Sequence, residues 1–155
     1  MKLNLGSNDL PLKDFINIDF DPAVKPDLVA DATKLPYEDE TVDEIYAGHL
    51  LEHFALNEEV LKEWYRVLKT GGKITITVPD VEKSLKLYSG GELSLDMLNQ
   101  VVFGADDRDL QNHHQVFTKD ILLLQMGKYF TSQIVEDSPH AYFKVKWQTI
   151  AEGIK

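Results

Sequence analysis

The chain has no cysteine among its 155 residues. This excludes disulfide bonds and thiolate metal sites, and it is compatible with a reducing compartment. Long apolar runs are also missing, since no stretch approaches the ~20 consecutive apolar residues of a membrane-spanning helix. The first residues carry a single lysine and no apolar run, so we expect no signal peptide. The sequence therefore predicts a cytoplasmic protein without a membrane partner.

Basic residues are few: 16 Lys and Arg stand against 26 Asp and Glu, which gives a formal net charge of −10. An acidic surface repels phosphate backbones, so we expect no nucleic-acid partner and a better fit to a neutral or cationic small molecule. What the chain does have is a hydrophobic fraction of 43%, enough for a packed core. We expect one domain over residues 1–155, whereas the oligomeric state is not indicated.

Strand-like and helix-like segments alternate along the chain. The expected strands are Lys2–Leu5, Phe15–Asp19, Asp27–Asp31, Val42–Ala47 and Lys73–Val78, and the expected helices are Asn57–Lys69, Val81–Tyr88, Leu93–Phe103 and Thr118–Tyr129. Phe130–Glu136 and Ala141–Ile150 then resemble a hairpin. This order predicts an α/β fold: a doubly wound, mostly parallel Rossmann-like sheet with helices on both faces and a C-terminal antiparallel hairpin.

Individual residues mark the ends and the buried faces of these elements. We expect Asn57 to cap its helix and Gly71-Gly72 to stop it, because a left-handed glycine commonly ends a helix. Trp64 and Trp147 lie on apolar faces and are expected in the core. The acidic run from Glu38 to Glu44 is expected to be a solvated loop.

The carboxyl ends of the predicted strands carry residues suited to ligand binding, because a parallel sheet binds ligands at that edge. Gly6 would let a ligand approach the backbone closely. Asp19 is suited to accept hydrogen bonds from vicinal ribose hydroxyls. Asp31 could accept from an exocyclic amine such as adenine N6, beside the amide of Ala32, although an Asp-Ala-Thr sequence could equally cap a turn. Together these residues indicate a nucleoside.

The features that bind a diphosphate are missing. Gly6 is the only glycine in the first 47 positions, so the G-x-G-x-x-G pattern is not met. The segment Ser7–Asp14 is too short, and too interrupted by Pro11, for a full helix whose N-terminus could hold a pyrophosphate. A nucleoside without phosphates remains, and S-adenosylmethionine is such a ligand, with a sulfonium that tolerates an acidic cleft.

The ordered run from LNLGSND through FINIDFDP, PDLVADATKLPYEDETVDEIYAGHLLEHF and RVLKTGGKITITVPD resembles the class I S-adenosylmethionine-dependent methyltransferases, and within them the small methyltransferase-domain, type 11-like group. The resemblance implies a cofactor-binding half, residues 1–80, and an acceptor-side half, residues 81–155. The family commonly has G-x-G-x-G and a helix after the first strand, where this chain has GSND. The resemblance places the cofactor against Leu5, Gly6, Ser7, Asp19, Phe20, Asp31, Ala32 and His49.

The pentapeptide HLLEH, residues 49–53, has the H-x-x-E-H spacing of one class of zinc peptidase. If it were helical, His49 and His53 would project from one face and could share an ion. That alternative, a zinc hydrolase, needs a third ligand further along the chain. The resemblance instead places His49 at the mouth of the cofactor cleft and gives Glu52 and His53 structural roles. We therefore predict no metal site.

Methyl transfer needs a base only when the acceptor is a hydroxyl or a similarly protonated group. Imidazole accepts protons near neutrality, so His113 and His114, which precede a predicted helix in the acceptor-side half, are candidate bases, with Asp80 as a third candidate. The tetrapeptide Val78-Pro79-Asp80-Val81 differs from the [D/N/S]-P-P-[Y/F] tetrapeptide usual in amino-methylating enzymes that act on nucleic acid. We therefore expect a small-molecule or glycan acceptor.

Two further alternatives remain open. The shortened first loop is compatible with a module that binds S-adenosylmethionine or a nucleoside without turnover. A nicotinamide-dependent oxidoreductase is disfavoured by the missing glycines and the missing helix.

Overall fold

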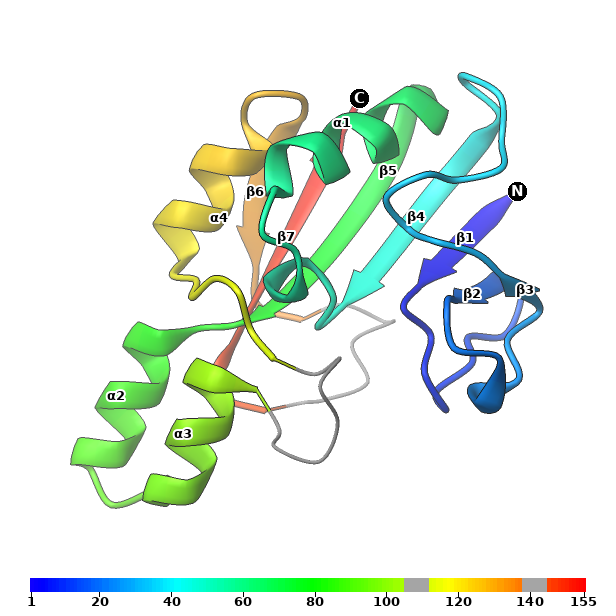
Figure 1. Ribbon diagram of the computed structural model, residues 1–155. Helices are drawn as coiled ribbons and strands as arrows, with labels where there is room; N and C mark the ends of the chain where they lie inside the picture. The colour runs from blue at the N-terminus through cyan, green and yellow to red at the C-terminus, as the bar shows by residue number, and fades with distance from the viewer. Residues whose placement is uncertain (105–111, 138–144) are drawn as a thin grey trace.

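The computed structural model describes residues 1–104, 112–137 and 145–155. Its strands form one seven-stranded sheet in the order β3-β2-β1-β4-β5-β7-β6 (Figure 1). Strands β1 to β5 are parallel, and β7 pairs antiparallel with both β5 and β6. The expected fold class, a mostly parallel Rossmann-like sheet with an antiparallel C-terminal pair, is confirmed. The strands are β1 (Lys2–Leu5), β2 (Ile16–Asp19), β3 (Leu28–Val29), β4 (Val42–Gly48), β5 (Leu68–Pro79), β6 (Thr131–Val135) and β7 (Gln148–Ile154).

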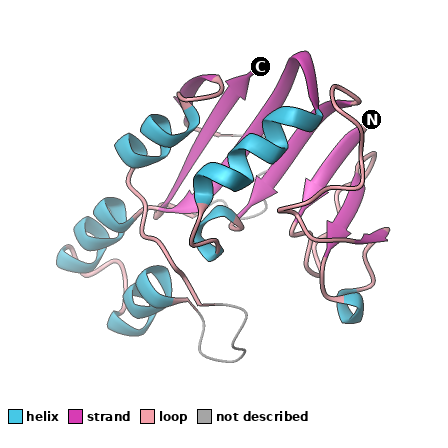
Figure 2. Ribbon diagram, turned by 45° about the horizontal axis from the view of Figure 1, so that its top comes forward, coloured by secondary structure: helices cyan, strands magenta, loops and turns pink. Residues whose placement is uncertain are grey.

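Four α-helices and two 3-10 helices connect these strands within the described residues. They are η1 (Pro22–Val24), η2 (Leu51–His53), α1 (Asn57–Val67), α2 (Val81–Ser89), α3 (Leu95–Phe103) and α4 (Lys119–Met126). The two helices that pack on the sheet, α1 and α4, lie on the same face (Figures 1 and 2). Helices α2 and α3 extend beyond the carboxyl ends of the strands. Every helix of the described residues is too short or too polar to span a lipid bilayer.

The core lies between the sheet and the pair α1 and α4. Alternate residues of the central strands, such as Leu3, Ile45 and Ile76, are fully buried there against Trp64 and Leu122. Burying such side chains stabilises the fold by about 1.5–3 kcal/mol each.

The opposite face of the sheet carries charged side chains. Strand residues on this face form ion pairs across β1 and β4, with Lys2 Nζ 2.7 Å from Glu44 Oε2, and across β5 and β7, with Lys73 Nζ 2.7 Å from Glu152 Oε1. The sequence predicted helices on both faces. Within the described residues, however, the β1–β2 and β2–β3 connections contain only turns and η1, so they supply no helix to cover this face.

Helix α1 begins and ends differently from the prediction. Leu56 occupies the N-cap position without a side-chain bond, whereas Asn57 donates to Gln115 Oε1 at 2.8 Å. The helix ends at Val67, before Gly71-Gly72, because Leu68 is already extended and pairs with β4. Gly71, with φ of +77°, instead lies at an irregularity inside β5.

The predicted C-terminal hairpin pairs as expected but has a different second strand. Strands β6 and β7 are antiparallel, with β7 beginning at Gln148, whereas the prediction began that strand at Ala141. Residues 138–144 lie outside the described residues. They include most of the turn expected between the two predicted strands and the first residues of the second one, among them Phe143. Trp147 immediately precedes β7, and its carbonyl oxygen accepts from the Asp80 amide at 2.8 Å, next to the last β5–β7 pair.

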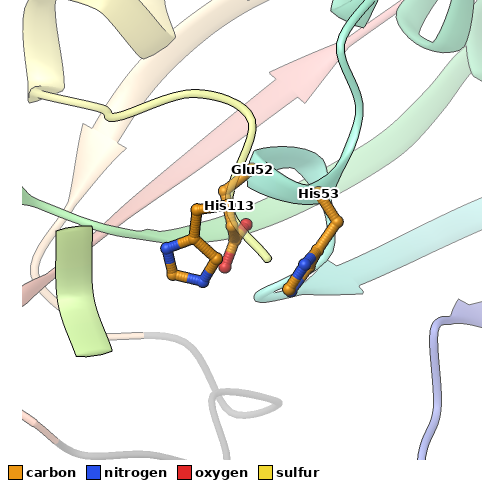
Figure 3. Close-up of side chains that lie close together, drawn as sticks. All are labelled: Glu52, His53 and His113. Carbon is orange, nitrogen blue, oxygen red and sulfur yellow. The ribbon is translucent and has the colours of Figure 1, made fainter. Parts of the chain in front are cut away.

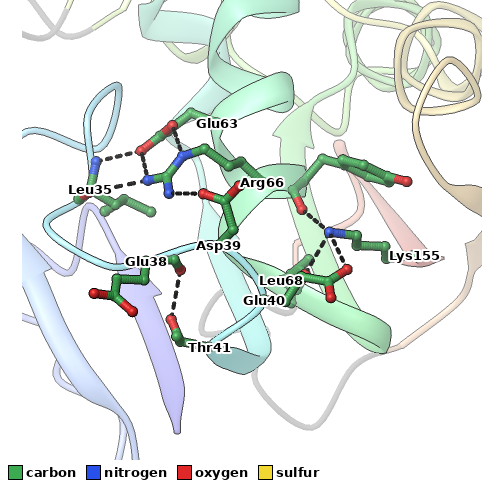
Figure 4. Close-up of polar contacts among 10 residues, drawn as sticks. Leu35, Glu38, Asp39, Glu40, Thr41, Glu63, Arg66, Leu68 and Lys155 are labelled. Atoms are coloured by element: carbon green, nitrogen blue, oxygen red, sulfur yellow. Dashed lines mark hydrogen bonds and ion pairs between the residues drawn. The ribbon is translucent and has the colours of Figure 1, made fainter.

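The acidic run from Glu38 to Glu44 is largely exposed, as expected of a solvated segment, but it is also held by basic side chains, and its last three residues belong to β4. Arg66 of α1 donates to Asp39 Oδ1 at 2.7 Å and to Glu63 Oε1 at 2.7 Å, and Glu63 in turn accepts from the Leu35 amide at 2.8 Å (Figure 4). Lys155 lies 3.3 Å from Glu40. These contacts fix the β3–β4 connection against α1 and the C-terminus.

Candidate functional site

A cleft of about 640 Å³ lies at the carboxyl ends of the parallel strands, where a sheet of this kind binds its ligand. One part, the aspartate half, is formed by Gly6, Asp19, Phe20, Asp31 and Ala32 at the ends of β1, β2 and β3. The other part, the histidine half, is formed by His49, Glu52, His53, His113 and Trp147. The structure thus brings together most of the predicted site residues from distant parts of the chain.

Gly6 is required by local geometry. Its φ is +63°, a conformation that residues with a side chain rarely adopt, and a Cβ at this position would lie 2.8 Å from Leu50 Cδ1. Both residues line the cleft, so a larger side chain here would push Leu50 into it. The predicted residues on either side of Gly6 are buried and do not line the cleft: Leu5 packs in the core, and the Ser7 hydroxyl oxygen has no hydrogen-bond partner among the described residues.

Asp19 is held rigidly at the end of β2. Its Oδ2 accepts from the Asn8 amide at 2.9 Å, and its Oδ1 accepts from the Asp21 amide at 3.0 Å. These two bonds fix the plane of the carboxylate, and each oxygen keeps a lone pair for another donor. The arrangement is suited to a pair of vicinal hydroxyls.

Asp31 has one of the two roles that the sequence left open, the capping of a turn, and it also lies in the cleft wall. Its Oδ1 caps the following turn by accepting from the Thr33 amide and the Thr33 hydroxyl, both at 2.8 Å, while the residue also lines the cleft. The next residue, Ala32, is held by Trp64 of α1, whose indole nitrogen donates to the Ala32 carbonyl at 2.9 Å. Phe20 completes this wall with a side chain that is 55% exposed, so a flat ring could stack on it.

The charge of the cleft is one-sided. Asp19, Asp21 and Asp31 line it, and none of the lysines and arginines of the described residues does. Phosphate groups are normally bound by such cations or by the N-terminus of a helix. The segment after β1 contains turns and no helix, as the sequence predicted. The cleft is therefore suited to a ligand without phosphates.

The HLLEH pentapeptide is not an α-helix. His49 directly follows β4 with a φ of +50°, and residues Leu51–His53 form the 3-10 helix η2. The two imidazoles are bound to different parts of the chain: His49 Nε2 lies 2.9 Å from Gln148 Oε1, and His53 Nδ1 lies 3.2 Å from the Asn112 carbonyl oxygen. His49 also makes an edge contact with Trp147, whose ring was expected in the core. The alternative in which His49 and His53 share one helical face is therefore not supported.

Glu52 is a buried acid in the wall of the cleft. Its side chain is 1% exposed, and neither carboxylate oxygen has a hydrogen-bond partner among the described residues. Burial raises the pKa of Glu52 to about 8, so the carboxyl is protonated near neutrality. His49 Nδ1 lies 3.6 Å away, but burial lowers the pKa of His49, and this contact is consequently not an ion pair at neutral pH. From the resemblance, Glu52 was expected to have only a structural role.

We expect the Glu52 carboxyl to make the folded state less stable as the pH rises. Its ordinary pKa is 4.5, so between pH 4.5 and 8 the unfolded chain releases a proton that the folded chain keeps. The free energy of unfolding then falls by up to about 1.4 kcal/mol per pH unit and levels off above pH 8. Chemical denaturation at several pH values in this range, with a chelator present, measures the free energy of unfolding. The decrease with pH that Glu52 causes should be seen in the wild type and should be missing in Glu52→Gln. Equal slopes would contradict the assignment.

The three candidate bases occupy different places. His113 lines the cleft, whereas His114 is exposed and is not among the lining residues. Asp80 is 1% exposed and caps α2: its Oδ1 accepts from the amides of Glu82 and Lys83 at 3.0 Å, and its Oδ2 accepts from the Thr149 hydroxyl at 2.6 Å. With both oxygens engaged away from the cleft, Asp80 is not supported as a base.

Several lining residues gave no signal in the sequence. Met97, Gln100 and Val101 reach the cleft from α3, and Trp147 reaches it from the segment before β7. The positions of these residues depend on how α3 and the segment before β7 pack at the strand ends. A local sequence pattern does not encode this packing.

Part of the chain is similar in sequence to known methyltransferases. Residues 9–76 match the family described as "Methyltransferase domain". An uncharacterized methyltransferase of Schizosaccharomyces pombe is 43% identical over 77 residues, which cover 43% of this chain and 30% of that protein. A sterol 4-C-methyltransferase of Caenorhabditis elegans is 43% identical over 49 residues, which cover 32% of this chain and 15% of that protein. The matched part is thus less than a third of each relative.

Solved structures share the whole fold. A SAM-dependent methyltransferase of Thermotoga maritima superposes with a TM-score of 0.69 at 19% identity, over 99% of this chain and 80% of that chain. A SAM-dependent methyltransferase of Methanosarcina mazei does so with a TM-score of 0.65 at 16% identity, over 99% of this chain and 91% of that chain. At these identities the likeness establishes the fold.

Proposed function

We propose that this chain, which carries a class I methyltransferase domain with S-adenosylmethionine as its cofactor, transfers a methyl group to a hydroxyl of a small molecule or glycan. The family resemblance predicted from the sequence is confirmed. The observation that carries the proposal is the convergence of Gly6, Asp19 and Asp31 in one acidic cleft at the strand ends.

In this proposal the cofactor occupies the aspartate half of the cleft. Asp19 accepts from the two ribose hydroxyls, and its two amide bonds keep it in position before the ligand arrives. Asp31 and the Ala32 amide face the adenine, with Phe20 beside it. Gly6 supplies backbone near the methionine part, with the buried Leu5 and Ser7 supporting it from outside the cleft, and His49 closes the cleft on the other side.

The bound cofactor supplies an already activated methyl group, so the protein mainly positions the acceptor and excludes water. When the acceptor is a hydroxyl, its oxygen must lose a proton as the new O–CH₃ bond forms. Of the three candidate bases, only His113 lines the cleft, so we assign it this role. Burial lowers the pKa of His113 to about 4, so its imidazole is neutral at pH 7 but a weak base.

The acceptor class is supported by the chemistry of the histidine half, where Glu52, His113 and Trp147 offer polar groups beside an aromatic ring. One relative is named for a sterol, which is a small molecule. The absence of basic residues among the described lining residues disfavours a phosphorylated acceptor or nucleic acid. The division into a cofactor-binding half, residues 1–80, and an acceptor-side half, residues 81–155, and the cytoplasmic location remain predictions.

A thermal-shift comparison tests the cofactor assignment. We expect S-adenosylmethionine and its demethylated product to raise the melting temperature, because a ligand at 100 times its Kd stabilises the folded state by about 2.7 kcal/mol. NADH should leave the melting temperature unchanged, because the cleft has no group for its diphosphate. Stabilisation by NADH and none by S-adenosylmethionine would refute the proposal.

A second function, binding without turnover, is favoured by one observation: the segment between β1 and β2 lacks the helix and the glycines that the family commonly has there. Incubation with labelled S-adenosylmethionine and pooled hydroxyl-bearing metabolites or glycans distinguishes the two functions. Label transferred to an acceptor supports the enzyme, and tight binding without any transfer supports the module.

A further inference from the structure

Three side chains with metal-binding chemistry meet in the histidine half of the cleft. Glu52, His53 and His113 each offer one ligand atom, and these atoms all lie within 4.8 Å of one another (Figure 3). The imidazoles of His53 and His113 are in edge contact, with ring centroids 4.9 Å apart. The third residue comes from 60 positions further along the chain, which the pentapeptide alone could not reveal.

The hydrogen bonds of the two histidines leave the same nitrogen available on each ring. His53 Nδ1 lies 3.2 Å from the Asn112 carbonyl oxygen, and His113 Nδ1 lies 3.0 Å from the Val101 carbonyl oxygen. A carbonyl oxygen only accepts, so each Nδ1 carries the proton, and each neutral ring keeps its lone pair on Nε2. Metal-binding histidines are typically held in this way, by a second nitrogen that donates to a carbonyl.

Glu52 provides an independent indication of a ligand. Its side chain is buried, and both of its carboxylate oxygens lack a hydrogen-bond partner among the described residues. Leaving a buried polar group unsatisfied costs about 1–3 kcal/mol, and more for a charged group. A bound cation would satisfy both oxygens and favour the ionised carboxylate.

We propose that Glu52, His53 and His113 form a binding site for a divalent transition-metal ion. Two imidazole nitrogens and one carboxylate are a donor set preferred by ions such as Zn²⁺, Fe²⁺ and Mn²⁺, whereas Mg²⁺ prefers oxygen ligands only. Ligands about 2.0–2.2 Å from one ion lie roughly 3.3–3.6 Å apart in a tetrahedral site. Ligand atoms of the three side chains that are further apart than this, within their 4.8 Å limit, must move closer together around the ion.

The position of the site gives the ion a role that rests on the proposed function. Three protein ligands leave coordination positions open to the cleft, as in catalytic metal sites. An acceptor hydroxyl bound there would lose its proton more easily, because the ion stabilises the resulting oxyanion. His113 is then a ligand through Nε2 rather than the proton acceptor, which agrees with its weak basicity.

Metal analysis of the purified protein, followed by titration with Zn²⁺ after removal of bound metal, tests the site. We expect one Zn²⁺ per chain in the wild type, and an affinity at least 100-fold lower in Glu52→Gln and in His113→Ala. His114→Ala is the matched control: it is the adjacent histidine, its side chain is exposed, and its Zn²⁺ affinity should equal that of the wild type. Mg²⁺ at millimolar concentration should not displace Zn²⁺. Circular dichroism establishes that each variant is folded.

Two results would overturn the site: no stoichiometric uptake of Zn²⁺ by the wild type, or the same loss of affinity in His114→Ala as in His113→Ala. S-adenosylmethionine binding is measured separately in the presence of a chelator, where we expect it to persist in all three variants. Binding of the cofactor without Zn²⁺ uptake refutes only the metal site, whereas Zn²⁺ uptake without cofactor binding refutes only the proposed function.

Discussion

Asp19→Ala is expected to weaken the binding of S-adenosylmethionine by about 10- to 100-fold. The substitution removes charge-assisted hydrogen bonds to the ribose hydroxyls, worth about 1.5–3 kcal/mol, where 1.4 kcal/mol corresponds to a tenfold change in Kd. It also frees the amides of Asn8 and Asp21, which now position the carboxylate. Isothermal titration calorimetry of the folded variant measures the change.

Two further variants separate the ribose contact from a general disturbance of the loop. Asp9→Ala removes an exposed carboxylate from the same β1–β2 connection, and its affinity should match that of the wild type. Asp19→Asn keeps the shape of the side chain and one acceptor oxygen. Its affinity for S-adenosylmethionine should therefore lie between that of the wild type and that of Asp19→Ala. If folded Asp19→Ala binds as tightly as the wild type, Asp19 does not bind the ribose.

Trp64→Ala is expected to destabilise the protein by about 3–5 kcal/mol, a large part of the stability of an ordinary domain. The side chain is fully buried between α1 and the sheet, and nothing nearby can fill the space that it leaves without moving the core. Urea denaturation followed by circular dichroism measures the loss. Trp147→Ala is a comparison of equal size, and we expect a smaller loss there because that ring is only partly buried in the wall of the cleft.

Trp64→Phe isolates the second role of this residue. A phenylalanine ring keeps most of the packing but leaves the Ala32 carbonyl without its 2.9 Å bond, at a cost of about 1–3 kcal/mol. Because Ala32 lies next to Asp31 at the end of β3, the adenine side of the cleft should loosen and S-adenosylmethionine affinity should fall severalfold. Unchanged affinity in Trp64→Phe would show that α1 supports the fold without positioning the cofactor.

The local patterns of the sequence were enough for most of the sheet. The short β-branched and apolar segments that became β1, β2, β4 and β5 were recognisable because each ends at a glycine, proline or acidic residue. The carboxyl ends of parallel strands lie at one edge, so Gly6, Asp19 and Asp31 could be predicted to meet before any coordinates were known. The C-terminal end of α1 was less predictable. Leu68 pairs with Val42 of β4, and this pairing replaces a continuation of the helix.

The sequence by itself thus determined the fold class, the acidic character of the cleft and the pair of aspartates that line it at the strand ends, because each follows from composition or from strand order. Only the tertiary structure decided the other half of the site. In the structure Asp80 caps a helix and His114 lies at the surface. His113 lies close to Glu52 and His53. Those contacts join segments that are distant in the chain, and their geometry depends on how the connections between β4 and α4 fold over the sheet.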